Sequence, residues 1–142
     1  MIQEEKQILL TDLCARVPYG VKIHVTYTNN EYDEAIYGIV KNEYDIPIVN
    51  PCENDIDKGL KLEQVKPYLR PMSSMTKNER LEISDFTSFI YKDYHQEETY
   101  SVVYQHMIDK YIDYLNSHFF DWRGLIPMGL ALEAKEGMYN IE

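Results

Sequence analysis

The sequence predicts an α+β fold: an N-terminal helix, a small antiparallel SH3-like barrel or open meander, then two helices and an ordered, extended C-terminal tail. Three observations carry this prediction. Apolar residues recur at helical spacing near the start, alternate with polar residues between positions 20 and 70, and return to helical spacing over residues 76–118. Short strands in succession, with no helix between them, favour antiparallel pairing. The 142 residues are expected to form a single compact domain.

The first helix is predicted over residues 3–17. Leu9, Leu13 and Val17 recur at a spacing of four residues, and acidic residues occupy the first turn. Pro18 cannot continue the helix and is expected to end it.

Residues 20–70 are predicted to contain four short strands. In VKIHVTYT, apolar and polar residues alternate strictly, which is typical of a half-buried strand. The pair Asn29-Asn30 is expected to turn the chain into a hairpin whose second strand lies around AIYGIVK. The third strand, YDIPIVN, contains Pro47, which has no N–H and is therefore placed at an edge or bulge. A long polar connection then leads to the fourth strand, LKLEQVKPYL.

The stretch VKPYLRPMSSMTKNE, residues 65–79, is interpreted as the joint between the sheet and the helices. Pro67 and Pro71 keep the residues before them out of helical conformation. Thr76 and Glu79 have the spacing of a capping box, in which each side chain bonds the other residue's amide. A helix is therefore predicted to begin at Thr76.

Two helices and a tail are predicted after the joint. Apolar residues from Leu81 to Ile90 form an imperfect stripe, and a broad apolar face runs from about Thr99 to Ser117. The tail, residues 119–142, is rich in glycine and in apolar residues, so we expect an ordered, mostly extended return across the core.

Three segments, LLTDLCARVPYGV, VKPYLRPMSSMT and DWRGLIPMGLALEAKEGMYNIE, resemble a family of small uncharacterised proteins encoded by gut Bacteroides-type bacteria, their prophages and their phages. The resemblance covers the start, the joint and the tail. It implies a phage or mobile-element origin, residence in the cytosol of the host and the same order of elements. The family has no assigned activity, cofactor or catalytic residue, so the resemblance transfers none.

The composition disfavours several classes of protein. The net charge of −10 repels phosphate backbones, which argues against non-specific nucleic-acid binding. No apolar run is long enough for a membrane span, and the start lacks the basic residues of a signal peptide, so a cytoplasmic location is expected. Two cysteines in unrelated contexts predict neither a metal motif nor a disulfide framework. Eight acidic residues against one lysine give residues 29–57 a net charge of −7, interpreted first as solvated loops.

No segment forms a convincing catalytic or metal-binding motif. His106, Asp109 and Asp113 share a helix face but are interpreted as solubilising residues. Residues 53–59, ENDIDKG, have their glycine one position too late for a calcium loop. His118 and Asp121 lack a nucleophile, so we lean against an enzyme and expect no cofactor.

Binding is therefore the favoured class of function, with another protein as the expected partner and a second copy of the chain as an alternative. The side chains considered as interface candidates are Tyr32, Tyr37, Tyr44, Tyr68, Arg70, Trp122 and Arg123. Trp122 is also interpreted as a plug where the tail turns back, with Arg123 paired to an acid. Two nucleic-acid alternatives stay open. The acidic region would imitate phosphates, or the basic cluster of Lys66, Arg70, Lys77 and Arg80 would bind nucleic acid.

Overall fold

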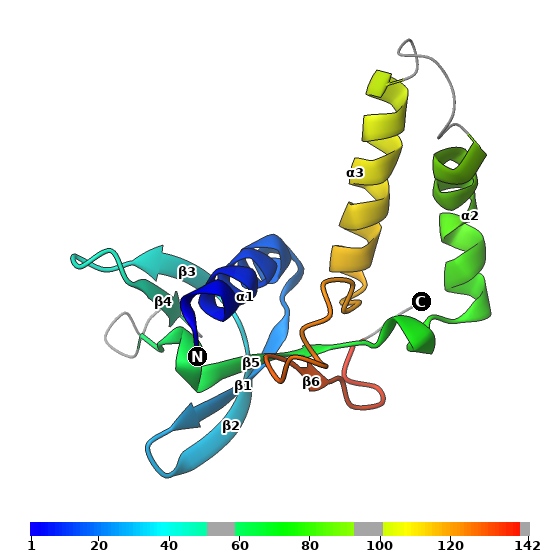
Figure 1. The fold of residues 1–142 in the computed structure, drawn as a ribbon. Helices are drawn as coiled ribbons and strands as arrows, with labels where there is room; N and C mark the ends of the chain where they lie inside the picture. Colours follow the sequence, from blue (N-terminus) through cyan, green and yellow to red (C-terminus); the bar gives the residue numbers. More distant parts are fainter. Residues whose placement is uncertain (51–58, 93–100, 140–142) are drawn as a thin grey trace.

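The computed structural model describes residues 1–50, 59–92 and 101–139 and shows an α+β fold (Figure 1). The helices are α1 (Gln3–Arg16), α2 (Lys77–Lys92) and α3 (Ser101–Ser117). The strands are β1 (Lys22–Tyr27), β2 (Asn30–Ala35), β3 (Gly38–Lys41), β4 (Pro47–Asn50), β5 (Val65–Leu69) and β6 (Leu132–Glu133). Short 3-10 turns are η1 (Val17–Tyr19), η3 (Leu62–Gln64) and η4 (Met72–Ser74). The predicted order of a helix, short strands and two further helices is confirmed, while the SH3-like barrel stays a prediction.

Four strands form one sheet in the order β2-β1-β5-β6, and β3 and β4 form a second. β1 pairs antiparallel with β2 and β5, whereas β6 pairs parallel with β5. The Ile36 amide donates to the Val21 carbonyl over 2.9 Å at the end of the β1–β2 ladder. Because such bonds alternate along an antiparallel pair, the backbone groups of Glu31 and Asp33 point away from β1, toward the open edge of the sheet.

The second strand of the first hairpin differs from the sequence prediction. The partner of β1 is Asn30–Ala35, with Lys22 opposite Ala35, and not the segment AIYGIVK. All six residues of β2 are exposed, so an edge strand solvated on both faces carries no apolar alternation that could reveal it. The acidic residues Glu31, Asp33 and Glu34 therefore lie on a strand, which corrects the interpretation of this part as loop.

The position of Pro67 inside the central strand β5 follows from hydrogen-bond alternation. Pro67 lies opposite Ile23, whose backbone groups face β2 by the same alternation. No N–H is needed toward β1 at this position. On the other side, the ladder with β6 begins only at Tyr68, so the missing N–H of Pro67 faces no paired strand.

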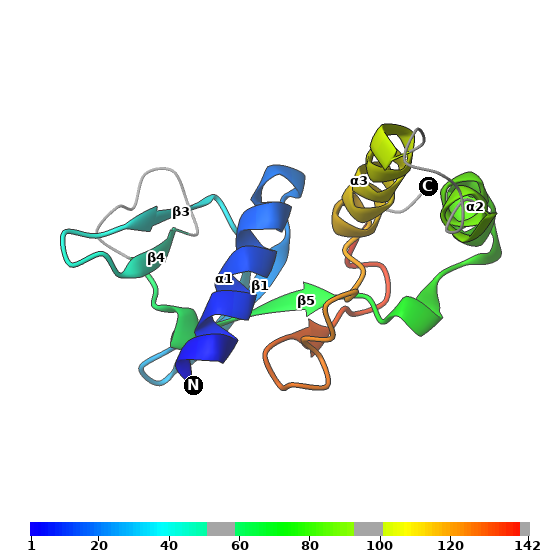
Figure 2. The same ribbon diagram turned by 45° about the horizontal axis from the view of Figure 1, so that its top comes forward.

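α1 lies across the strands and buries the larger of two apolar clusters (Figure 2). Leu9 and Leu13 of α1 pack with residues such as Ile23, Val25 and Leu69. α1 gives way to η1 and then to Gly20, whose φ of 71° lies in the left-handed region and turns the chain into β1. The predicted helix–turn–strand start is therefore confirmed.

The joint after β5 is built as the sequence predicts. The Thr76 amide donates to Glu79 Oε1 over 2.9 Å, and the Glu79 amide donates to Thr76 Oγ1 over 3.2 Å. Met75, just before this cap, packs into the second apolar cluster, which lies at the base of the helical hairpin formed by α2 and α3. In Figure 1 this hairpin rises from the end of β5, away from β3 and β4.

The tail is described as far as residue 139 and consists mainly of turns, with β6 as a short strand. The expectation of a mostly extended tail is therefore wrong. Gly124 and Gly129 adopt φ of 78° and 76°, and each reverses the chain. Asp121 stabilises the first reversal because its carboxylate accepts from the Leu125 and Ile126 amides at 2.7 and 2.9 Å.

Candidate functional site

Four large apolar side chains are exposed along the β3–β4 hairpin, and together we call them the hairpin surface. Tyr37, Val40, Tyr44 and Ile46 have exposed fractions of 55%, 51%, 75% and 46%. Val40 pairs with Ile48 on the outer face of β3–β4, whereas Ile39 and Val49 face inward and pack against the core. The pleat thus divides the apolar residues of this hairpin between the core and the solvent.

The loop that presents Tyr44 is held by its own hydrogen bonds. The Asn42 side-chain oxygen accepts from the Tyr44 and Ile46 amides at 2.9 and 3.0 Å, and the Asn42 amide donates to the Ile46 carbonyl. Asp45 completes the turn with a φ of 62°. Tyr44 is therefore presented on an ordered turn of the β3–β4 hairpin. In Figures 1 and 2, β3 and β4 lie at the end of the molecule opposite α2 and α3.

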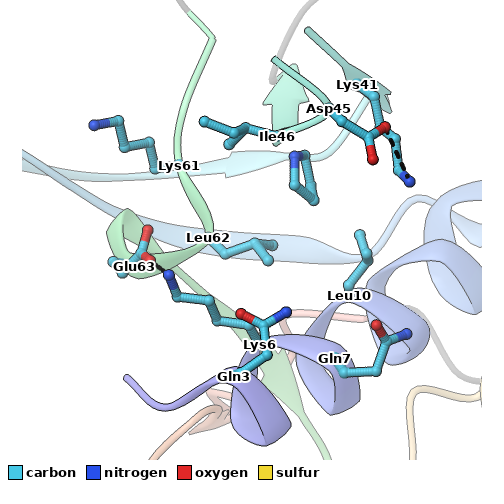
Figure 3. A pocket seen from close by; sticks show the side chains of 11 residues that line it. Gln3, Lys6, Gln7, Leu10, Lys41, Asp45, Ile46, Lys61, Leu62 and Glu63 are labelled. Carbon is cyan, nitrogen blue, oxygen red and sulfur yellow. Dashed lines mark ion pairs between the residues drawn. The ribbon is translucent and has the colours of Figure 1, made fainter.

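A groove of about 320 Å³ lies next to the hairpin surface, between α1 and the β3–β4 hairpin (Figure 3). Leu10 of α1, Leu62 of η3, and Ile46 and Pro47 of the hairpin provide its apolar lining. Three lysines, two acids and two glutamines complete the walls, so the lining carries a net positive charge in a chain with a net charge of −10. Ile46 belongs both to the groove and to the hairpin surface, so the two features are continuous.

The outer face of the four-stranded sheet carries a polar network centred on Asp33. Its Oδ1 lies 2.8 Å from His24 Nδ1 and accepts from the Tyr68 hydroxyl over 2.8 Å, while Oδ2 accepts from Lys135 Nζ over 3.1 Å. The hydrogen bond to His24, together with those to Tyr68 and Lys135, lowers the pKa of Asp33 to about 2. Burial, followed by the bond to Asp33, raises the pKa of Tyr68.

This network fastens the tail to the sheet. Tyr68 is only 3% exposed, and its carbonyl accepts from the Tyr139 hydroxyl in the tail over 2.8 Å. Tyr68 therefore contributes to the fold and offers little area to a partner, which corrects its place among the interface candidates. Asp33 was counted among the acids of residues 29–57, but the sequence did not indicate that it meets His24 and Lys135, because strand pairing and the return of the tail bring these side chains together. Tyr32, the remaining candidate on β2, is exposed and lies opposite Val25.

Arg70 is used within the fold. Its two terminal nitrogens each donate to a Glu79 carboxylate oxygen over 2.7 Å, and its guanidinium stacks 4.2 Å above the Phe120 ring. The bond from Arg70 is the largest cause that lowers the pKa of Glu79 to about 2. The Arg70 side chain is buried. Of the four residues in the predicted basic cluster, only Lys66, Lys77 and Arg80 are therefore exposed. The proposed presentation of Arg70 to a phosphate is therefore not supported by this geometry.

Trp122 and Arg123 also connect parts of the fold. Trp122 Nε1 donates to Asn116 over 2.8 Å, and its ring packs against the second apolar cluster. Arg123 donates to Asp12 over 2.7 Å and lies 4.0 Å above the Trp122 ring. Trp122 therefore packs within the fold where the tail turns back, and Arg123 is paired with an acid, as expected from the sequence.

A buried charge network on α1 was missed by sequence reasoning. Arg16 donates to both oxygens of Asp12 at 2.9 and 3.0 Å, and to the Phe120 carbonyl over 2.6 Å. Both side chains are fully buried. The spacing of four residues inside an apolar face was the available signal, but exposed pairs with this spacing are far more common.

The remaining candidates stay apart from one another. His118 stacks on Tyr114 with a centroid distance of 3.9 Å, and the Asp121 carboxylate is occupied by the tail amides, so the two do not pair. Asp109 accepts from Gln105, and in the described parts of the chain no three His, Cys, Asp or Glu side chains are placed to hold a metal ion. Residues 53–58 of the calcium-like segment, and Cys52, lie outside the described residues; Cys14 is exposed and free.

In comparisons with known proteins, no family model, no curated protein and no solved structure matched the chain. Within the described residues, no helix combines the length and the apolar character that crossing a membrane requires.

Proposed function

We propose that this protein is a protein-binding module and that the hairpin surface is its contact site. The observation that carries the proposal is the exposure of Tyr37, Val40, Tyr44 and Ile46 within ten residues. Tyrosine is enriched in protein interfaces, whose buried centres are more apolar than the rest of the surface, and several exposed large apolar residues on one short hairpin favour such a site. The ordered turn around Asn42 supports the proposal, because a pre-organised loop loses less entropy on binding.

The partner is another protein with an apolar pocket and a mixed or basic rim. Glu43 and Asp45 flank Tyr44 in the sequence, and the exposed acids Glu31 and Glu34 lie on β2. The resemblance to phage and prophage proteins supports a partner in the bacterial cytoplasm, such as a defence or transcription protein. Within this proposal, a second copy of the chain is the alternative partner.

The test compares capture by the wild-type protein with capture by a Val40→Ser/Tyr44→Ser variant. Tyr19→Ser is the matched control, because Tyr19 is also exposed but lies in η1. We expect the wild type and Tyr19→Ser to retain one host protein after nuclease treatment, and the hairpin variant to lose it. Equal recovery by all three proteins would contradict the proposal. Light scattering of the purified wild type distinguishes the self-association alternative.

Nucleic-acid mimicry is a second candidate, favoured by the three carboxylates of β2, a strand whose six residues are all exposed. Asp33 is engaged by His24, Tyr68 and Lys135, so Glu31 and Glu34 are the better probes. If the partner binds nucleic acid, Glu31→Lys/Glu34→Lys is expected to slow association, most strongly at low salt, because long-range attraction is screened beyond about 8–10 Å at physiological ionic strength. An unchanged on-rate would exclude mimicry.

A further inference from the structure

The groove between α1 and the β3–β4 hairpin combines an apolar centre with cations at both ends. Leu10, Leu62 and Ile46 line the same space in Figure 3, with the Lys41–Asp45 pair on one side, the Lys6–Glu63 pair on another and Lys61 next to Ile46. The apolar centre is thus bordered by three lysines and two acids, and the excess of one positive charge is complementary to an extended segment that carries acidic side chains beside an apolar one.

The charges of the groove are only partly neutralised inside the protein. Lys6 pairs with Glu63 over 2.7 Å, and Lys41 pairs with Asp45 over 3.4 Å. Among the described residues, the Lys61 ammonium has no carboxylate partner, although its charge helps to lower the pKa of Glu63 after the larger effect of the Lys6 bond. The groove thus presents one uncompensated cation in a protein that otherwise repels anions.

Local contacts connect the walls of the groove. The Lys6–Glu63 pair ties α1 to η3 at one end, and the hydrogen bond from the Lys61 amide to Gln64 Oε1 holds the start of η3. The hairpin wall is held by the Asn42 turn. At about 320 Å³ the space is at the low end for small-molecule pockets, so it suits one or two side chains of a longer segment rather than a whole cofactor.

We propose that this groove binds an extended acidic and apolar segment of the protein partner, with an apolar side chain between Leu10 and Ile46 and carboxylates on Lys61 and Lys41. The inference rests on the proposed function and deepens it, because the groove shares Ile46 with the hairpin surface. The partner segment is extended like a strand, and in it glutamate or aspartate alternates with leucine-like residues.

The experiment uses the full chain and a short capped peptide of alternating glutamate and leucine, titrated while amide signals are followed by NMR. We expect shifts at Gln7, Ile46 and Leu62, and at least about fivefold weaker binding for Lys61→Glu and Lys41→Gln, since both remove a charge-assisted contact. Lys77→Glu is the matched control, because Lys77 is exposed at the start of α2, outside the groove, and should leave binding unchanged. A peptide of alternating glutamine and leucine should bind at least about fivefold more weakly.

Three results would overturn the inference: no binding of the acidic peptide, equal binding of the glutamine peptide, or equal loss with Lys77→Glu. The Val40→Ser/Tyr44→Ser variant separates this inference from the proposed function. Neither residue lines the groove, so this variant should still bind the peptide. If the peptide does not bind but partner capture is lost in the Val40→Ser/Tyr44→Ser variant, only the proposal for the groove is contradicted. If the peptide binds but this variant still captures the partner, only the proposal for the hairpin surface is contradicted.

Discussion

The part of the molecule built from α1 and the strands differs from the α2–α3 hairpin in what stabilises it. The first part buries a large apolar cluster to which α1, β1, β4, β5 and the tail all contribute. The described cluster of the helical hairpin has a much smaller buried centre: Met75, Ile83, Leu115 and Phe120. Because burial of each large aliphatic side chain contributes about 1.5–3 kcal/mol, the described residues of the first part are expected to resist local unfolding more than those described at the base of the helical hairpin.

Between the two parts, hydrogen bonds and charged side chains take the place of buried apolar area. The segment from Phe119 to Asp121 lies between the two parts and is bonded from both sides. Arg16 donates to the Phe120 carbonyl over 2.6 Å, the Arg70 amide donates to the Phe119 carbonyl over 2.7 Å, and the Asp121 amide donates to the Arg70 carbonyl over 2.8 Å. Directional bonds of this kind fix an orientation that a small apolar contact leaves loose.

We call the segment Phe119–Asp121, with the residues bonded to it, the junction. The largest expected effect comes from a substitution in α1, on the side of the junction that faces the sheet. Asp12→Ala removes the carboxylate that neutralises Arg16 and pairs with Arg123. Arg16 stays fully buried and loses its counter-charge, so the free energy of unfolding should fall by about 3–5 kcal/mol, measured by urea denaturation. Asp113→Ala, an exposed position on α3, is the control and should change it by less than about 0.5 kcal/mol. A small loss for Asp12→Ala would mean that the buried pair does not hold α1 to the junction.

The next prediction concerns the Arg70–Glu79 pair at the start of α2 and the pH dependence of the free energy of unfolding. The bond from Arg70, together with the smaller effect of the Thr76 bonds, lowers the pKa of Glu79 from 4.5 to about 2, so the ionised form is favoured in the folded state. This contribution is fully present above pH 4.5 and disappears as pH falls toward 2, a total of about 3 kcal/mol. Unfolding free energies measured from pH 6 to pH 3 should fall more steeply for the wild type than for Glu79→Gln. Asp33 also titrates in this range, so the comparison uses the difference between these two proteins, and parallel curves would contradict the prediction.

The local signals in the sequence predicted the helical side of the junction better than the sheet side. Thr76 and Glu79 lie three residues apart, and their capping box follows from sequence spacing alone. The bonds from Arg16 to Phe120 and from Tyr68 to Asp33 join residues far apart in the chain, and no periodicity encodes such pairs. β2 was missed because its stability comes from pairing with β1 rather than from apolar alternation.

For the candidate site, the sequence indicated residue types but not their exposure. Tyr37, Tyr44 and Tyr68 are equivalent by composition, yet pairing places the first two in solvent and the third under Asp33 and Lys135. Arg70 was predicted to be an interface residue, but its side chain pairs with Glu79, which the sequence had indicated only as part of the helix cap. The groove was not predictable, because its walls come from α1, the β3–β4 hairpin and η3.

A smaller effect is expected from a substitution that acts on the helical hairpin alone. Thr76→Ala removes the side chain that accepts from the Glu79 amide, and loss of a cap of this kind costs about 1 kcal/mol. Hydrogen exchange followed by mass spectrometry should show faster exchange in the first turns of α2 and unchanged exchange in β1. Thr11→Ala, an exposed helix position in α1, is the comparison variant. Faster exchange throughout the sheet would show that the two parts unfold as one unit.

The smallest expected effect concerns the hairpin surface, which contributes to neither apolar cluster. Tyr44 is 75% exposed and its turn is held by the Asn42 side chain and by backbone groups, so Tyr44→Ser leaves those bonds in place. We expect the free energy of unfolding to change by less than about 0.5 kcal/mol, measured by urea denaturation. Asn42→Ala is the matched test of the same loop, because two amides then lose their acceptor, and it should cost about 1 kcal/mol or more. If Tyr44→Ser is as destabilising as Asn42→Ala, Tyr44 is part of the fold rather than of a binding surface, and the hairpin surface loses its most exposed member.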